Sequence, residues 1–205
     1  MKIFYSTSSP FVRKVMVVAH ELGIADKIER MKSAVHPIRF DAGVVEHNPL
    51  GQVPTFFTDG DLVLYDSRVI CEYLDDRFGR AEIFPKNSDL RWRALTDQVL
   101  ADGMTSAALL IRYELTVRDE AMQNAAWVAG QRRKIEDGVR LLEATVREWR
   151  HRFDIGTIAV ACSLSYLEFK LPEINWRSAC PNVACWLDGV GQRPSLRKTV
   201  PVLPS

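Results

Sequence analysis

Hydrophobic and polar positions follow two different patterns along the chain. Up to Gly79, short alternating segments typical of strands are mixed with amphipathic helical segments. From Asp89 onward no alternating segment appears, and the apolar positions recur at helical spacing. Three long helices are predicted there, over Leu90 to about Tyr113, roughly Glu120 to Arg150, and Asp154 to Phe169. We therefore predict an α/β domain over residues 1–79, a linker over 80–88 and an all-α helical domain over 89–205.

The first domain has the element order βαβαββα. The hairpin is the strongest local signal, because Asp59-Gly60 separates two short runs of strand-forming residues. The helix after the first strand is expected to cross over to a second strand beside it. A short irregular helix is expected between the second strand and Asn48. The predicted strands are Lys2–Ser6, Ile28–Lys32, Thr55–Thr58 and Leu62–Tyr65, and the two main helices are Pro10–Leu22 and Ser67–Phe78.

The segment from Asn48 to Ser67 combines a turn, a proline, a hairpin and a helix start. Pro54 stands directly before a strand, where it donates no ladder hydrogen bond. If the bond before Pro54 were cis, the backbone of Val53 would point outward, toward a ligand. Asp66 and Ser67 then open a helix whose free amides face the same side.

This segment resembles the glutathione-binding half of the cytosolic glutathione S-transferases, which have a thioredoxin-like first domain. The resemblance implies a cis-proline at Pro54, backbone pairing of Val53 with the cysteine of glutathione, and a hold on the γ-glutamyl carboxylate by Asp66 and Ser67. It also implies a polar contact to the tripeptide from Gln52. An ordinary hairpin followed by a capped helix explains each motif separately, but not their order and spacing.

Ser9 is the candidate catalytic residue. It precedes Pro10, which suits the first helical position, so the Ser9 hydroxyl is a natural N-cap. The same hydroxyl can instead donate a hydrogen bond to a bound thiolate, and a thiol with a pKa of about 8.5 needs such help at neutral pH. The stretch around Ser9 and Phe11 is similar to that of bacterial, serine-type, theta- or zeta-like transferases, and it implies that Phe11 contacts glutathione. Thr7 and Ser8 remain alternatives as the activating hydroxyl.

The residue that binds the glycine carboxylate of glutathione is left open. His36, Arg39 and His47 could reach it, but each lies in a polar stretch where a solvated side chain explains it equally well. We assign none of them.

The start of the third long helix departs from the family pattern. The family has Ser or Thr followed three residues later by Asp, whereas here Asp154 precedes Thr157. Asp154 can cap the helix, but we expect Thr157 not to return the full bond of a capping box, which weakens this helix.

Composition limits the partners. The 205 residues carry a net charge of +1, which gives no field that favours nucleic acid or an anionic membrane. No apolar run approaches the roughly 20 residues of a membrane span, and Met1-Lys2 leads directly into a strand, so we expect a cytoplasmic protein. Cys71, Cys162, Cys180 and Cys185 lack zinc-ligand spacing, so we expect reduced cysteines and no metal.

Three functions follow from the resemblance. We expect a glutathione transferase of detoxification, an enzyme that takes reduced glutathione as co-substrate and directs its thiolate at a small hydrophobic electrophile. We also expect a homodimer, with the helix from Leu90 at its interface. The alternative is a non-catalytic binding or regulatory module with the same fold. A glutathione-dependent thiol reductase is the least favoured, because Ser9 replaces the cysteine that such enzymes use for mixed disulfides.

Overall fold

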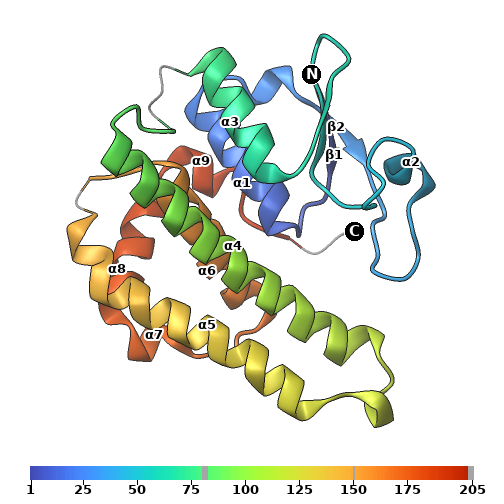
Figure 1. Cartoon of the computed structure of the whole chain (residues 1–205). Coiled ribbons are helices and arrows are strands. Elements are labelled where there is room, and N and C mark those ends of the chain that lie inside the picture. The colour runs from blue at the N-terminus through green and yellow to red at the C-terminus, as the bar shows by residue number, and fades with distance from the viewer. Residues whose placement is uncertain (80–82, 150, 203–205) are drawn as a thin grey trace. The chain divides into compact units, whose positions relative to one another are not determined.

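A computed structural model describes residues 1–79, 83–149 and 151–202 of the chain (Figure 1). Contacts within the chain divide it into two compact units. The N-terminal unit contains Met1–Arg91 together with the residues from Pro194 onward, and the helical unit contains Trp92–Arg193. Part of the predicted linker, residues 80–82, lies outside the described residues, so the domain boundaries given above remain predictions.

The N-terminal unit is built on a mixed sheet. The described strands lie in the order β2-β1-β3-β4, with β1 parallel to β2 and antiparallel to β3, and with β3 antiparallel to β4. The predicted βαβαββα order and α/β class are confirmed. The elements are β1 (Lys2–Tyr5), α1 (Pro10–Glu21), η1 (Ala25–Lys27), β2 (Glu29–Lys32), α2 (Ala42–Val45), β3 (Thr55–Phe57), β4 (Val63–Leu64) and α3 (Ser67–Phe78).

Helix α1 forms the centre of this unit. It packs against α3, and its apolar positions from Val12 to Ala19 are buried. A short helix, α9 (Pro194–Arg197), packs on α1 as well. The buried Arg13 guanidinium joins them by donating to the Leu196 carbonyl at 3.3 Å and to the Thr199 hydroxyl at 3.4 Å. Sequence order alone assigned this last segment to the second domain, whereas its contacts place it in the N-terminal unit.

The helical unit contains no strand in the part of the chain that the structure describes, as predicted. The predicted helix from Glu120 is interrupted, because Asn124 accepts a hydrogen bond from the Trp127 amide at 3.0 Å and begins a new helix. The elements are α4 (Ser88–Val117), η2 (Glu120–Met122), α5 (Ala125–Thr145), η3 (Val146–Glu148), α6 (Ile155–Lys170), α7 (Trp176–Ala179) and α8 (Pro181–Val190).

Two glycines allow close packing around α4. A Cβ atom at Gly138 would lie 2.5 Å from the Met104 sulfur, so α5 approaches α4 closely there, and the two helices run side by side in Figure 1. A Cβ atom at Gly156 would lie 2.6 Å from the Ala94 carbonyl oxygen. The first turn of α6 therefore also lies directly on α4.

The expectation of a weakened cap on α6 is wrong. The Thr157 hydroxyl accepts from the Asp154 amide at 3.0 Å, and Asp154 accepts from the amides of Gly156 and Thr157 at 3.1 and 3.2 Å. This is a complete capping box in reversed order, in which the carboxylate stands at the N-cap and the hydroxyl returns the bond. Arg152 adds an ion pair to Asp154 at 2.8 Å.

Cys71, Cys162 and Cys180 are buried and Cys185 is exposed, and none of the four forms a disulfide bond with another described residue. Among the described residues, no helix is both long enough and apolar enough to cross a membrane.

Candidate functional site

Pairing in the sheet brings the predicted site residues of the N-terminal unit to one edge. Phe4 pairs with Thr55 in the antiparallel β1/β3 ladder, and Phe56 pairs with Leu64 in the antiparallel β3/β4 ladder. The end of β1, the start of β3 and the end of β4 therefore meet at the same edge. The segments that continue from these three points are Ser6–Ser9, Val53-Pro54 and Tyr65–Ser67.

The turn before β3 is held by the buried Asn48 side chain. Its amide nitrogen donates to the Gln52 carbonyl at 3.2 Å and to the Thr55 hydroxyl at 2.9 Å, and its oxygen accepts from the Leu50 amide at 3.1 Å. The Thr55 hydroxyl donates to the same Gln52 carbonyl at 2.8 Å. These bonds fix the turn by a side chain inside it, whereas the Gln52 side chain is exposed.

Val53 leaves its backbone available at the end of this turn. The Val53-Pro54 bond is cis, as the resemblance implies. Pro54 is buried and Val53 is partly exposed. Within the described residues, the backbone amide and carbonyl of Val53 make no hydrogen bond. A peptide-like ligand could therefore pair with both groups.

Ser9 is the N-cap of α1, as predicted. Its hydroxyl accepts from the Val12 amide at 3.3 Å, and its backbone amide donates to the Ser6 carbonyl at 3.3 Å. The two alternative hydroxyls are placed differently. Thr7 donates its hydroxyl hydrogen to the Val202 carbonyl at 3.1 Å, and the Ser8 hydroxyl lies 3.4 Å from that of Ser6.

Asp66 caps α3, and Ser67 is the first residue of that helix. The Asp66 carboxylate accepts from the Arg68 amide at 2.9 Å and forms an ion pair with the Arg68 guanidinium at 2.9 Å. Burial opposes ionisation of Asp66, but the bonds from Arg68 and the charges of Arg68 and Lys14 outweigh it and lower the pKa of the carboxyl. Ser67 is only 1% exposed, whereas the Asp66 side chain is 49% exposed. The peptide bond between Tyr65 and Asp66 is cis.

Lys14 is a candidate site residue that the sequence analysis missed. It is buried in α1, its ammonium lies 5.7 Å from the centre of the partly exposed Phe11 ring, and its charge acts on Asp66. The signal was its spacing, because Lys14 stands three residues after Phe11 and four before Val18, on the predicted apolar face. A lysine there has to reach a polar group at the sheet edge.

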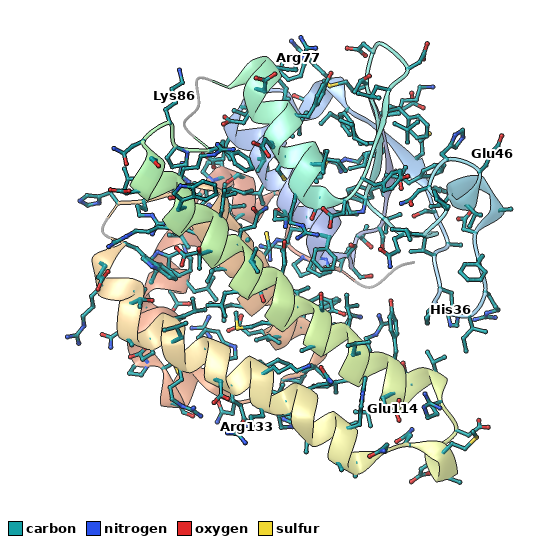
Figure 2. All side chains as sticks on the ribbon, in the orientation of Figure 1. His36, Glu46, Arg77, Lys86, Glu114 and Arg133 are labelled. Atoms are coloured by element: carbon teal, nitrogen blue, oxygen red, sulfur yellow. The ribbon has the colours of Figure 1, made fainter. Side chains whose placement is uncertain are left out.

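The loop between β2 and β3 uses its polar residues for its own structure. The His36 ring nitrogen Nδ1 accepts from the amides of Ile38 and Arg39 at 3.2 and 3.3 Å. The His47 ring packs edge-on against Phe57, with ring centres 4.9 Å apart. Figure 2 shows His36 on this loop and Glu46 beside α2. In the described residues, no group of three or more His, Cys, Asp or Glu side chains could hold a metal ion.

Comparisons with known proteins agree with this geometry. Residues 8–77 match the family model described as glutathione S-transferase, N-terminal domain. The chain is 30% identical over 205 residues to the uncharacterized GST-like protein YibF of Escherichia coli K12, covering 98% of each chain.

Solved structures extend the comparison. A glutathione transferase family member from Pseudomonas fluorescens Pf-5, with bound glutathione, matches with a TM-score of 0.96 and 41% identity over 98% of this chain and 99% of that one. A structure of a family member from the same organism, with bound S-(propanoic acid)-glutathione, matches with a TM-score of 0.91 and 40% identity over 99% and 100% of the two chains. The chain described here belongs to the glutathione S-transferase family.

Proposed function

We propose that this protein is a glutathione transferase in which the N-terminal unit binds reduced glutathione and the Ser9 hydroxyl stabilises its thiolate. The observation that carries this proposal is the meeting of three groups at one sheet edge: the Ser9 hydroxyl, the unpaired Val53 backbone and the start of α3 at Asp66. Each of these groups matches one part of the tripeptide.

Hydrogen-bond geometry favours Ser9 over Thr7 as the activating group. The Ser9 hydroxyl uses an oxygen lone pair for the Val12 amide, so its hydrogen is still available for a thiolate. The Thr7 hydrogen is already used by the Val202 carbonyl. A donor and the positive end of α1 together lower a thiol pKa by about one to three units from its ordinary value of about 8.5.

The other predicted residues hold the tripeptide in this proposal. The Val53 backbone pairs with the amide and carbonyl of the ligand's cysteine, with Pro54 fixing the turn. Asp66, whose carboxyl group is ionised at neutral pH as an aspartate ordinarily is, binds the ammonium of the γ-glutamyl group. Ser67 and the first amides of α3 bind its carboxylate. Phe11 and the exposed Gln52 contact the remaining surface of the ligand.

The relatives support the reaction class. Bound glutathione in one of them and bound S-(propanoic acid)-glutathione in the other are consistent with a thiol that is presented to a carbon electrophile. In the reaction proposed here, the sulfur forms a bond to an electrophilic carbon. The leaving group departs with its electron pair, or a proton adds to the neighbouring carbon when the electrophile is an activated alkene.

Assembly and location belong to the same proposal. We propose a homodimer, because α4 exposes apolar side chains on its surface, among them Trp92 and Val99. We also propose that the protein works in the cytoplasm, where reduced glutathione is present. The absence of a disulfide bond among the described cysteines is consistent with that compartment.

A panel of halogenated aromatics, epoxides, isothiocyanates and peroxides, assayed for glutathione consumption, tests the function. We expect conjugation with at least one class, and loss of most of that activity in Ser9→Ala. Glutathione binding by calorimetry runs in parallel. Intact binding with no consumption across the panel would replace the enzyme by the non-catalytic binding module.

A further inference from the structure

Two cations of the helical unit have no acidic partner among the described residues. Arg112 lies on α4 and Lys170 in the last turn of α6, and neither forms an ion pair with any residue that the structure describes. The acids nearest to them in sequence pair with other arginines instead: Glu114 with Arg118, Glu168 with Arg177, and Glu173 with Arg132.

These two cations also lie close to one another. Burial lowers the pKa of Lys170, and the positive charge of Arg112 lowers it further. The Lys170 ammonium lies 4.1 Å from the centre of the Phe169 ring, which supplies only a weak counter-charge. Two partly buried positive charges without an anion between them repel each other, which is unfavourable. The cluster therefore lacks a negative charge that would offset this repulsion.

A buried hydroxyl completes the cluster. Tyr166 stands one helical turn before Lys170 on the same face of α6 and is 2% exposed. Its hydroxyl has no hydrogen-bond partner in the described chain, although buried tyrosines usually find one. Burial raises the pKa of Tyr166, whereas the charge of Arg112 and a polar interaction between its guanidinium and the phenol oppose that rise. The guanidinium therefore lies close to the phenol, but it does not reach the distance and angle of a regular hydrogen bond.

A purely structural explanation covers only part of this arrangement. A lysine in the last turn of a helix interacts favourably with the free carbonyls there, which accounts for Lys170. It does not account for Arg112, whose charge repels Lys170, or for the unpartnered hydroxyl of Tyr166. All three groups are donors, so one acceptor with a negative charge would satisfy them together.

We propose that Arg112, Tyr166 and Lys170 bind the carboxylate of an organic acid, and that this acid is the electrophilic co-substrate. The second half of the proposal rests on the function proposed above. A guanidinium matches the two oxygens of a carboxylate, and the hydroxyl and ammonium can bond to the same oxygens. A carboxylate fits better than a phosphate dianion, because a partly buried site beside aromatic rings desolvates one charge more readily than two.

Two electrophiles of equal shape test the proposal. In 4-chloro-3-nitrobenzoate and 4-chloro-3-nitrobenzamide, a thiolate forms a bond to the carbon that bears chlorine, and chloride leaves with its electron pair. Only the first carries a carboxylate. Calorimetry without glutathione should show at least about tenfold tighter binding of the benzoate, as expected for charge-assisted hydrogen bonds. With glutathione, the benzoate should have the lower KM by a similar factor.

Three variants and a matched control assign the preference to residues. Arg112→Gln and Lys170→Gln should each weaken benzoate binding about tenfold and leave benzamide binding unchanged. Arg133→Gln makes the same charge change on α5, where the side chain is 82% exposed and points away from the helices in Figure 2, and it should alter neither ligand. Tyr166→Phe should weaken benzoate binding without lowering the thermal midpoint, because it removes an unpaired buried hydroxyl.

Other results would overturn parts of the proposal. Equal binding of the two electrophiles, or equal effects of Arg112→Gln and Arg133→Gln, would overturn the site. A lower thermal midpoint of Tyr166→Phe with unchanged benzoate affinity would do the same, because it indicates packing alone. Inorganic phosphate that competes as strongly as the benzoate would overturn the carboxylate class. Preferential benzoate binding with no conjugation would support the carboxylate site and overturn the transferase function.

Discussion

The Ser9 hydroxyl accepts a hydrogen bond from the Val12 backbone amide at 3.3 Å, which caps α1 and leaves the hydroxyl hydrogen unused. One side chain is thus proposed to serve both folding and catalysis. Ser9→Ala removes both roles at once. We expect a loss of about 1 kcal/mol in the free energy of unfolding. The pKa of bound glutathione should rise by about one to two units and turnover should slow roughly ten- to a hundredfold near neutral pH. Denaturant titration and thiolate absorbance measure the two effects on the same sample.

Two further variants separate these roles of Ser9. Ser8→Ala is the control and should change neither quantity, because the Ser8 hydroxyl contacts only Ser6 among the described residues. Ser9→Cys should lose conjugation and gain mixed-disulfide exchange with glutathione, because a thiol is a weak donor but a competent nucleophile. Lower stability of Ser9→Ala with an unchanged thiol pKa would make Ser9 a cap alone and return attention to Thr7 and Ser8.

Ser67 should contribute to glutathione affinity through the start of α3. Ser67→Ala removes a hydroxyl that we expect to bond to the γ-glutamyl carboxylate, and affinity should fall by about 1.5 to 3 kcal/mol. Calorimetry measures this loss, and turnover at saturating glutathione should be nearly unchanged. Ser178→Ala, in the helical unit, is the control. An unchanged dissociation constant for Ser67→Ala would mean that the γ-glutamyl group is held elsewhere.

Glu143 should make stability depend on pH. Its carboxylate accepts from the amides of Asn182 and Val183 at 3.1 and 2.9 Å, at the start of α8. Burial opposes ionisation, but these bonds outweigh it and lower the pKa. The stabilisation is therefore complete above the unfolded pKa of about 4.3 and is lost as the pH falls through the lower folded value. Glu143→Gln should cost about 1 kcal/mol at pH 7 and little at pH 3, by urea unfolding.

The control for Glu143 is Glu136→Gln, an exposed position on the same helix. It should be neutral at both pH values. The stability difference between wild type and Glu143→Gln should become smaller in acid. If it does not, the negative charge of Glu143 is not what stabilises the start of α8.

Arg152 should be the main electrostatic support of α6. It pairs with Asp97 at 3.0 Å and with the buried Asp154 at 2.8 Å. Arg152→Met leaves both carboxylates without their cation, so we expect a loss of about 2 to 4 kcal/mol. Adding Asp97→Asn should restore part of it. Arg93→Met, which removes an exposed pair to Glu148 at 3.6 Å, should cost less than about 1 kcal/mol. Equal losses in the two single variants, measured in urea, would contradict this role.

The surface of α4 should hold the proposed homodimer together. Trp92 and Val99 stand seven residues apart on one helical face and are 63% and 58% exposed in the single chain. Replacing both by Glu should shift the sedimentation of the protein at micromolar concentration from dimer to monomer. Leu141→Glu, which changes an exposed apolar residue of α5, is the control. A monomeric wild type would end the proposal.

Short-range patterns predicted most of the fold. Ser67–Phe78 was predicted with both of its ends, because a cap stands at one end and Gly79 at the other. The reversed capping box of α6 was missed, because the expectation compared it with a motif and not with the donors and acceptors that Asp154 and Thr157 carry. The break before Ala125 was also missed, since the N-cap role of Asn124 depends on one side-chain bond.

Some residues of the candidate sites could likewise be predicted from the sequence, and others could not. The residues of the Asn48–Ser67 segment could be predicted, because their spacing within a single stretch carries the information. Lys14 was missed because its role depends on the position of Asp66, far away in sequence. Arg112 and Tyr166 lie on different helices, and nothing in either local pattern indicates that their side chains are neighbours. Their grouping follows from tertiary packing alone.

The packing of α9 on α1 determines when the N-terminal unit can finish folding during translation. Arg13 leaves the ribosome early, but its acceptors at Leu196 and Thr199 are translated some 180 residues later. Until then, Arg13 lacks its hydrogen-bond acceptors at Leu196 and Thr199, and α1 lacks the packing contacts that α9 provides. The N-terminal unit therefore completes its folding only after the helical unit has been translated, and chaperones have that interval in which to act on it.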